Sequence, residues 1–241
     1  MNEFMKNILY NSKKIKINRL LMIYLAVGMI LYLKEYSSFS YINFIYAGLG
    51  HPYVLSFFLL PVCFIKIAYL LFNTDNKNII SRFPSKKNFY IFQIKMIFKE
   101  LNSIFFLYLF ILFVSANLFA SRDNFLLPDA NYREILNIVG LGFLLIKLYV
   151  LLITINILSV CSKNLLDNKI FLVISMIFII SFMDFITIGH LEVILPSYYV
   201  GFKHIFSSFS LNILCSLLYF SIINIINYLV LKKITYKRDI I

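Results

Sequence analysis

Long apolar runs constrain the fold of this chain more than any single motif does. A helix rises about 1.5 Å per residue, so it needs about 20 mostly apolar residues to cross a hydrocarbon core about 30 Å thick. The chain of 241 residues contains stretches of this kind along its whole length. They are approximately Leu20–Phe39, Pro52–Phe72, Ile104–Ala120, Ile138–Cys161, Ile170–Gly189 and Phe209–Leu231. We therefore expect six transmembrane helices in a single transmembrane domain over residues 1–241.

The composition agrees with a lipid-embedded chain. Hydrophobic residues make up 61% and charged residues 14% of the sequence, whereas a soluble domain has roughly 45–50% apolar and about 25% charged residues. Runs such as Ser103–Val114 and Phe171–Ile180 lack the alternation with period two that marks the strands of a membrane barrel. The sequence thus predicts an all-α integral membrane protein.

The basic residues gather on one side of the predicted bilayer. Of the 23 Lys and Arg residues, 17 fall in the N-terminal segment, the connections between spans two and three and between spans four and five, the base of the third helix, and the C-terminal tail. Cytoplasmic loops carry an excess of Lys and Arg, so we expect a multi-pass protein of the cell membrane with both termini in the cytoplasm. The net charge of +12 is then a topology signal and a contact with anionic lipid. We expect no nucleic-acid partner.

Two terminal or outer segments have patterns of their own. Residues 1–18 place apolar side chains at helical spacing opposite Lys6 and Lys13, which predicts a helix in the cytoplasmic interface. A frayed basic terminus also fits. The outer segment 190–208 contains Pro196 and Gly201 and fits a re-entrant hairpin or an interfacial loop before the last span.

The cytoplasmic segment 73–88 leads into a long helix. From Phe89 to Ala120, a continuous helix would be about 48 Å long. That length exceeds the bilayer, so we expect its lower end to project into the cytoplasm or to tilt along the interface. The segment before it fits a docking site for a cytoplasmic partner, or an ordinary basic loop.

Polar residues inside the spans are candidates for a pathway. Charges in hydrocarbon are costly and are functional candidates by default. Lys147 lies deep in its span and Asp184 in the next one, and we hypothesise that the two form a pair. Lys66 lies nearer the cytoplasmic end and is expected to snorkel. Asn156 and Asn224 are expected to join helices by hydrogen bonds more often than to contact a ligand.

Familiar chemical motifs are missing. The sequence has no G-x-x-x-x-G-K-[ST], H-E-x-x-H, G-x-S-x-G or C-x-x-C pattern. The three His lack the spacing of metal ligands, and each of the three Cys lies in an apolar run. We therefore predict no catalytic residues, no metal site and no cofactor on this chain.

Three local segments and the layout resemble a known family, and the first of these segments is the basic interfacial stretch before the first span. The stretch from Ile80 to Phe89, with a Lys-bearing run into the third span, looks like the R-x-x-S-[RK]-[RK] segment of ABC-2 type permeases, and Ile194–Tyr199 looks like their outer L-P turn. The chain resembles the small six-span subunits of bacterial exporters and self-immunity pumps for antimicrobial peptides. Its short first span departs from that pattern.

The resemblance implies a fold, partners and a function. The fold would be the type V ABC exporter transmembrane domain. Two permease subunits, identical or sister chains, would sit on separate ATPase subunits that bind ATP and Mg. The chain would export a hydrophobic or amphipathic peptide. The residues implied to couple it to the ATPase are Ile79, Ile80, Ser81, Arg82, Phe83, Pro84, Ser85, Lys86 and Lys87.

Two other function classes remain open at this point. The chain fits a membrane immunity or binding protein that sequesters a peptide without ATP. It also fits the substrate-binding membrane subunit of a vitamin uptake system. Co-purification of an ATPase separates the first from a permease, and tight binding of a small molecule by the isolated chain identifies the second.

Overall fold

The computed structural model describes residues 12–36, 41–50, 52–74, 80–81, 83–120, 134–165, 171–176 and 209–238. This part of the chain is helical and contains no strand. The helices are α2 (Ser12–Leu33), α3 (Tyr41–Gly50), α4 (Pro52–Val54), α5 (Leu60–Thr74), α7 (Lys86–Phe119), α8 (Glu134–Leu165) and α11 (Phe209–Arg238). A short 3-10 helix, η1 (Lys34–Tyr36), follows α2, and a π-helical segment, η2 (Leu55–Leu59), joins α4 to α5. Residues 171–176 form a further helical turn.

Among the described residues, three helices are long and apolar enough to cross a membrane. They cover Leu55–Thr74, Lys86–Phe119 and Leu141–Asn164. The apolar parts of α2 (Arg19–Leu33) and α11 (Leu214–Val230) are shorter. These helices confirm a membrane-embedded, all-α protein. The predicted fifth span, Ile170–Gly189, and the outer segment 190–208 lie almost entirely outside the described residues.

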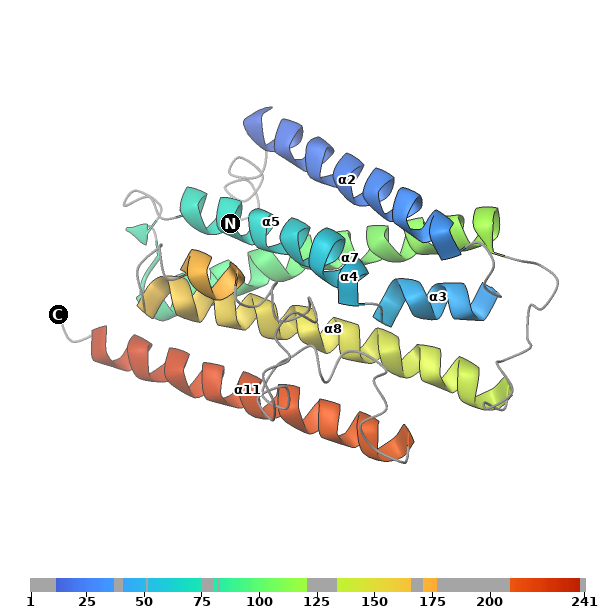
Figure 1. Cartoon of the computed structure of the whole chain (residues 1–241). Coiled ribbons are helices and arrows are strands. Elements are labelled where there is room, and N and C mark those ends of the chain that lie inside the picture. Colours follow the sequence, from blue (N-terminus) through green and yellow to red (C-terminus); the bar gives the residue numbers. More distant parts are fainter. Residues whose placement is uncertain are drawn as a thin grey trace.

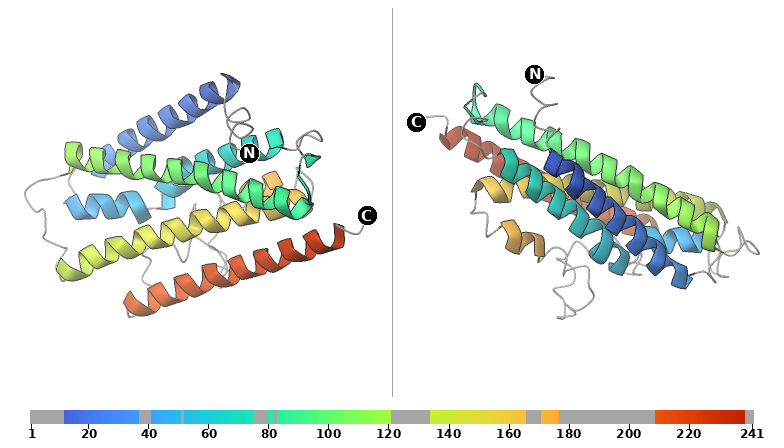
Figure 2. Two further views of the ribbon diagram at one scale, coloured as in Figure 1. Left: turned by 180° about the vertical axis from the view of Figure 1, so that it is seen from behind. Right: turned by 90° about the horizontal axis from the view of Figure 1, so that it is seen from above.

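The long helices run side by side (Figures 1 and 2). The chain passes along α2, returns through α3, α4 and α5, runs back along α7, and returns again along α8 (Figure 1). α11 lies along α8 at the outside of the bundle, and α2 lies on the opposite side. Consequently the start of α2, the end of α5, the start of α7, the end of α8 and the end of α11 share one end of the molecule.

Proline and tyrosine explain the π-helical segment. Pro61 has no N–H, so the carbonyl of Phe57, four residues earlier, lacks its donor at the α-helical spacing. The Tyr24 hydroxyl of α2 donates to that carbonyl at 2.6 Å. The N–H of Leu60 reaches the carbonyl of Leu55, which is the π spacing. A neighbouring helix thus satisfies the group that proline leaves unpaired, as the hydrocarbon interior requires.

The helix α3 was not predicted; it lies between the first two expected spans. Phe44 and Leu49 are buried, and the Tyr108 hydroxyl of α7 donates to the carbonyl of Gly48. A Cβ at Gly48 would meet Leu112 Cδ1 at 2.1 Å, so glycine permits this close approach. Packing against α7 and α8 stabilises a ten-residue helix that contains two glycines.

Two predicted boundaries at the N-terminal end need correction. The first span was expected to reach Phe39, but α2 ends at Leu33, directly before the charged pair Lys34 and Glu35. The N-terminal interfacial helix was expected over 1–18, but residues 12–18 belong to α2, which continues into the apolar run without a break. Residues 1–11 lie outside the described part. The long helix predicted from Phe89 onward is confirmed, since α7 is one helix of 34 residues.

Candidate functional site

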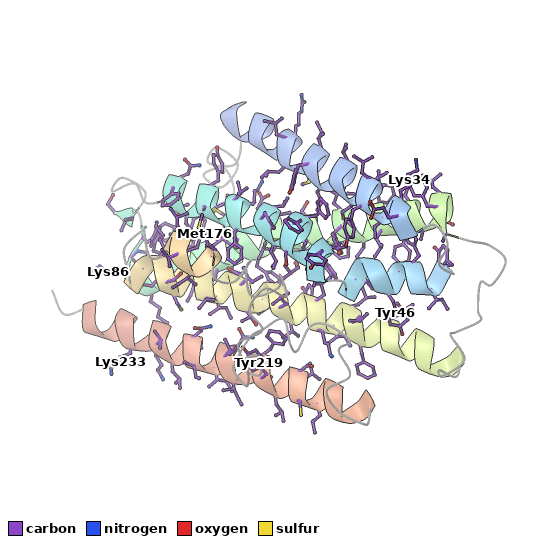
Figure 3. All side chains as sticks on the ribbon, in the orientation of Figure 1. Lys34, Tyr46, Lys86, Met176, Tyr219 and Lys233 are labelled. Atoms are coloured by element: carbon purple, nitrogen blue, oxygen red, sulfur yellow. The ribbon has the colours of Figure 1, made fainter. Side chains whose placement is uncertain are left out.

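Exposed basic side chains mark the end of the bundle where α7 begins. Figure 3 places Lys86 and Lys233 at this end and Lys34 at the other. We call it the basic end. The exposed Lys and Arg side chains that the structure describes there are Arg19, Lys86, Lys87, Lys95, Lys99, Lys232 and Lys233. The chain segments that were predicted to lie in the cytoplasm therefore converge in space.

The predicted coupling segment forms a tight turn before α7. The N–H of Phe83 donates to the carbonyl of Ile80 at 3.1 Å. Ser85 has extended backbone angles (φ −151°, ψ 157°), and its hydroxyl accepts from the N–H of Asn88 at 3.2 Å. This is the geometry of a serine N-cap, which supplies an acceptor to an otherwise unpaired donor of the first helical turn. Ile79 and Arg82, the other predicted members, lie outside the described residues.

Phe83 anchors the turn to α7. Its ring centroid lies 5.4 Å from that of Phe89 and 5.1 Å from that of Phe92. An apolar contact across a helix N-terminus fixes the angle at which the chain enters the helix. The exposed residues of the segment are Ser81, Pro84, Lys86 and Lys87. The segment is thus held from one side and accessible from the other.

A buried polar network lies behind the segment. Gln93 is 0% exposed; its Nε2 donates to Thr74 Oγ1 at 3.1 Å, and its Oε1 accepts from Asn164 Nδ2 at 3.1 Å. The Lys163 Nζ donates to the carbonyl of Leu71 at 2.9 Å. The network joins the ends of α5 and α8 to the base of α7. The network was not predicted from the sequence, although Gln93 is conspicuous as an uncharged polar residue between apolar neighbours.

The environment of Lys66 differs from the one predicted. Lys66 was predicted to snorkel, but its side chain is 3% exposed, and its Nζ lies 3.0 Å from Glu100 Oε2. Glu100 is the single acidic residue of α7, and its side chain is 20% exposed. A buried ammonium is stabilised by a paired carboxylate rather than by water, so the pair connects α5 to α7 within the membrane-spanning region.

Of the predicted pair of Lys147 and Asp184, the structure describes only Lys147. Lys147 is buried in α8, at 3% exposure, as expected for a charge deep in a span. Asp184 lies outside the described residues, so its pairing with Lys147 stays a prediction.

The asparagines join helices, as predicted. Asn156 Nδ2 on α8 donates to the carbonyl of Ile94 on α7 at 3.0 Å. Asn224 Nδ2 on α11 donates to Thr154 Oγ1 on α8 at 3.0 Å. Within the described residues, the Oδ1 atoms of both asparagines are buried without a hydrogen-bond partner. Each amide therefore keeps one unused acceptor.

The described residues contain no group of three or more His, Cys, Asp or Glu side chains that would hold a metal ion. Comparisons with known proteins add no assignment: no family model matches the chain, and searches of curated proteins and of solved structures find no similar protein.

Proposed function

We propose that this chain is the permease subunit of an ABC transporter of the ABC-2 type, which exports a hydrophobic or amphipathic peptide with energy from a separate ATPase. The basic end faces the cytoplasm in this proposal, as positive residues favour. A second permease subunit completes the membrane part. The layout of basic segments and apolar helices and the resemblance of residues 80–89 to the family's cytoplasmic segment support this assignment.

One observation carries the proposal: the exposed turn before α7 is attached to the longest helix of the described part. Phe83 packs on Phe89 and Phe92, and the Ser85 cap continues the turn into α7. Gln93, two turns further on, connects α7 to α5 and α8. A push on the turn would therefore move several helices together, as a rigid-body switch requires.

A charge reversal tests the proposal. The double variant Lys86→Glu, Lys87→Glu should lose association with the partner ATPase, while the chain still inserts into the membrane. Both side chains are exposed, so the change leaves the packing of α7 intact. Co-purification of the ATPase with the tagged chain and ATP hydrolysis by the purified complex are the measurements.

The matched control is Lys232→Glu, Lys233→Glu. It reverses the same charge at the same end, on α11 instead of α7. We expect it to keep the ATPase. If the α7 variant retains the ATPase as well, the coupling assignment is wrong. If the wild-type chain is fully active in vesicles without any nucleotide-hydrolysing partner, the permease proposal itself is wrong.

A further inference from the structure

One face of α7 is uncovered along most of its length within the described part of the chain. Its members recur every three or four residues, so they lie on one side of the helix. They are Lys95, Lys99, Ser103, Phe106, Phe110 and Phe113, and all are exposed. The half nearer the basic end is polar and cationic, and the other half is aromatic. We call this the α7 face.

The two lysines lie at a depth where other helices expose apolar side chains. Contacts of Thr74 with Gln93 and of Lys66 with Glu100 place Lys95 and Lys99 beside the last turns of α5. Phe72, in those turns, is 42% exposed. The Cys161 Sγ contact with the carbonyl of Asn227 places the corresponding part of α11 next to the end of α8. There α11 exposes Ile225, Ile226 and Leu229, at 53–58%.

Neither lysine of the α7 face has an ion-pair partner among the described residues. The nearest acidic side chain in sequence, Glu100, is engaged with Lys66. An ammonium group at the edge of the hydrocarbon extends toward the headgroup region, where phosphates lie. Clusters of basic side chains at this level favour anionic headgroups. The half of the α7 face nearer the basic end therefore fits a phosphate group, and the aromatic half fits the hydrocarbon of an acyl chain.

We propose that the α7 face binds an anionic phospholipid from the leaflet at the basic end, with its phosphate at Lys95 and Lys99 and its acyl chains along Phe106 and Phe110. Lys99 and Phe110 are eleven residues apart, or about 16 Å along the helix. That distance is similar to half of a hydrocarbon core about 30 Å thick. The proposal rests on membrane embedding alone and is independent of the proposed transport function.

A second copy of the chain fits this face less well. A two-fold symmetric contact through the α7 face would bring the lysines of one copy toward the same lysines of the other. Like charges placed together oppose association. A phospholipid supplies both the negative group and the hydrocarbon that this face lacks.

Lipid binding to the purified full-length chain tests the proposal. Native mass spectrometry with phosphatidylglycerol and with phosphatidylcholine of identical acyl chains measures both affinities. We expect the wild type to prefer phosphatidylglycerol. Each lysine near an anionic group contributes about fivefold, so Lys95→Gln, Lys99→Gln should weaken phosphatidylglycerol binding by about 25-fold. Binding of phosphatidylcholine should not change. Phe106→Ala, Phe110→Ala should weaken both lipids, because it removes the acyl contact.

Controls distinguish this site from diffuse attraction and from other occupants. Lys232→Gln, Lys233→Gln removes the same charge from α11 and should leave phosphatidylglycerol binding unchanged; an equal loss would overturn the proposal. Displacement of the lipid by inorganic phosphate alone would overturn the acyl part of the site. Cross-linking of Phe106→Cys, in a Cys215→Ser background, into a dimer in membranes would show that a second copy covers the face instead.

Discussion

The interface between α5 and α7 differs from the interface between α8 and α11 in how its polar groups are satisfied. Between α5 and α7, Lys66 pairs with Glu100 at 3.0 Å, and Gln93 donates to Thr74 at 3.1 Å. Between α8 and α11, Asn224 donates to Thr154 at 3.0 Å, but its Oδ1 is buried without a partner in the described part. Asn227 Nδ2 is likewise buried without a hydrogen-bond partner in the described part.

The difference indicates which helices form the fixed part of the bundle. A buried ion pair holds its two helices in one register, because displacement would separate two charges in a medium of low polarity. A single amide bond with an unused acceptor allows a helix to exchange one partner for another. We infer that the buried pair makes α5 and α7 one fixed body, and that the polar contacts between α8 and α11 exchange more easily.

The largest effect is expected from Glu100→Gln. This change leaves the Lys66 ammonium buried without its carboxylate, and breaking a buried pair costs about 3–5 kcal/mol. Unfolding of the purified protein in detergent, followed by circular dichroism against temperature or denaturant, measures the loss. We expect no comparable loss for Lys99→Gln, which changes an exposed side chain on the same helix one residue away.

A double variant distinguishes the loss of the whole ion pair from the loss of one of its two charges. Lys66→Met combined with Glu100→Leu replaces both charges by apolar groups of similar size. It should recover most of the stability, because replacement of a whole buried pair is often neutral or stabilising. A double variant as unstable as Glu100→Gln would mean that Glu100 acts through another contact, and the fixed body would need a different explanation.

An intermediate effect is expected from Gln93→Leu. The Thr74 hydroxyl keeps the carbonyls of Leu70 and Leu71 as acceptors at 3.0 Å, and Asn164 Nδ2 keeps the carbonyl of Val160 at 2.7 Å. One N–H of the Asn164 amide, however, loses its acceptor on Gln93. An unsatisfied buried group costs about 1–3 kcal/mol. The same unfolding measurement applies. Asn164→Ala added to Gln93→Leu should cost less than the sum of the two, because the residues share one network. Strict additivity would contradict that network.

Local patterns predicted the long helices, because hydropathy and helical spacing are properties of neighbouring residues. The course of α7 followed from its apolar length and from the Lys-bearing run at its base, where Lys95 and Lys99 are exposed. Ser85 was not predicted as the N-cap of that helix, because residues 79–87 were interpreted only as a coupling segment.

Contacts between helices were predicted less well. Lys66 was expected to reach water because it lies toward the cytoplasmic end of its span, whereas its actual partner, Glu100, lies on another helix. The helix α3 was missed because its glycines disfavour an isolated helix, whereas Gly48 is useful only beside Leu112 and Tyr108. Such features depend on which helices are neighbours in space, and the local patterns of a single sequence do not show which helices pack together.

The smallest effect is expected at the interface between α8 and α11, where two variants sharpen the comparison. Asn224→Leu removes one inter-helix hydrogen bond together with an oxygen that has no partner, and such bonds in membranes average about 0.6 kcal/mol. Thr154→Val should cost more, because it removes the acceptor and leaves the Asn224 amide buried. Unfolding measurements on both variants give this order. If Asn224→Leu is as destabilising as Glu100→Gln, then α11 belongs to the same fixed body as α5 and α7, because a helix held that firmly cannot be the one that exchanges partners.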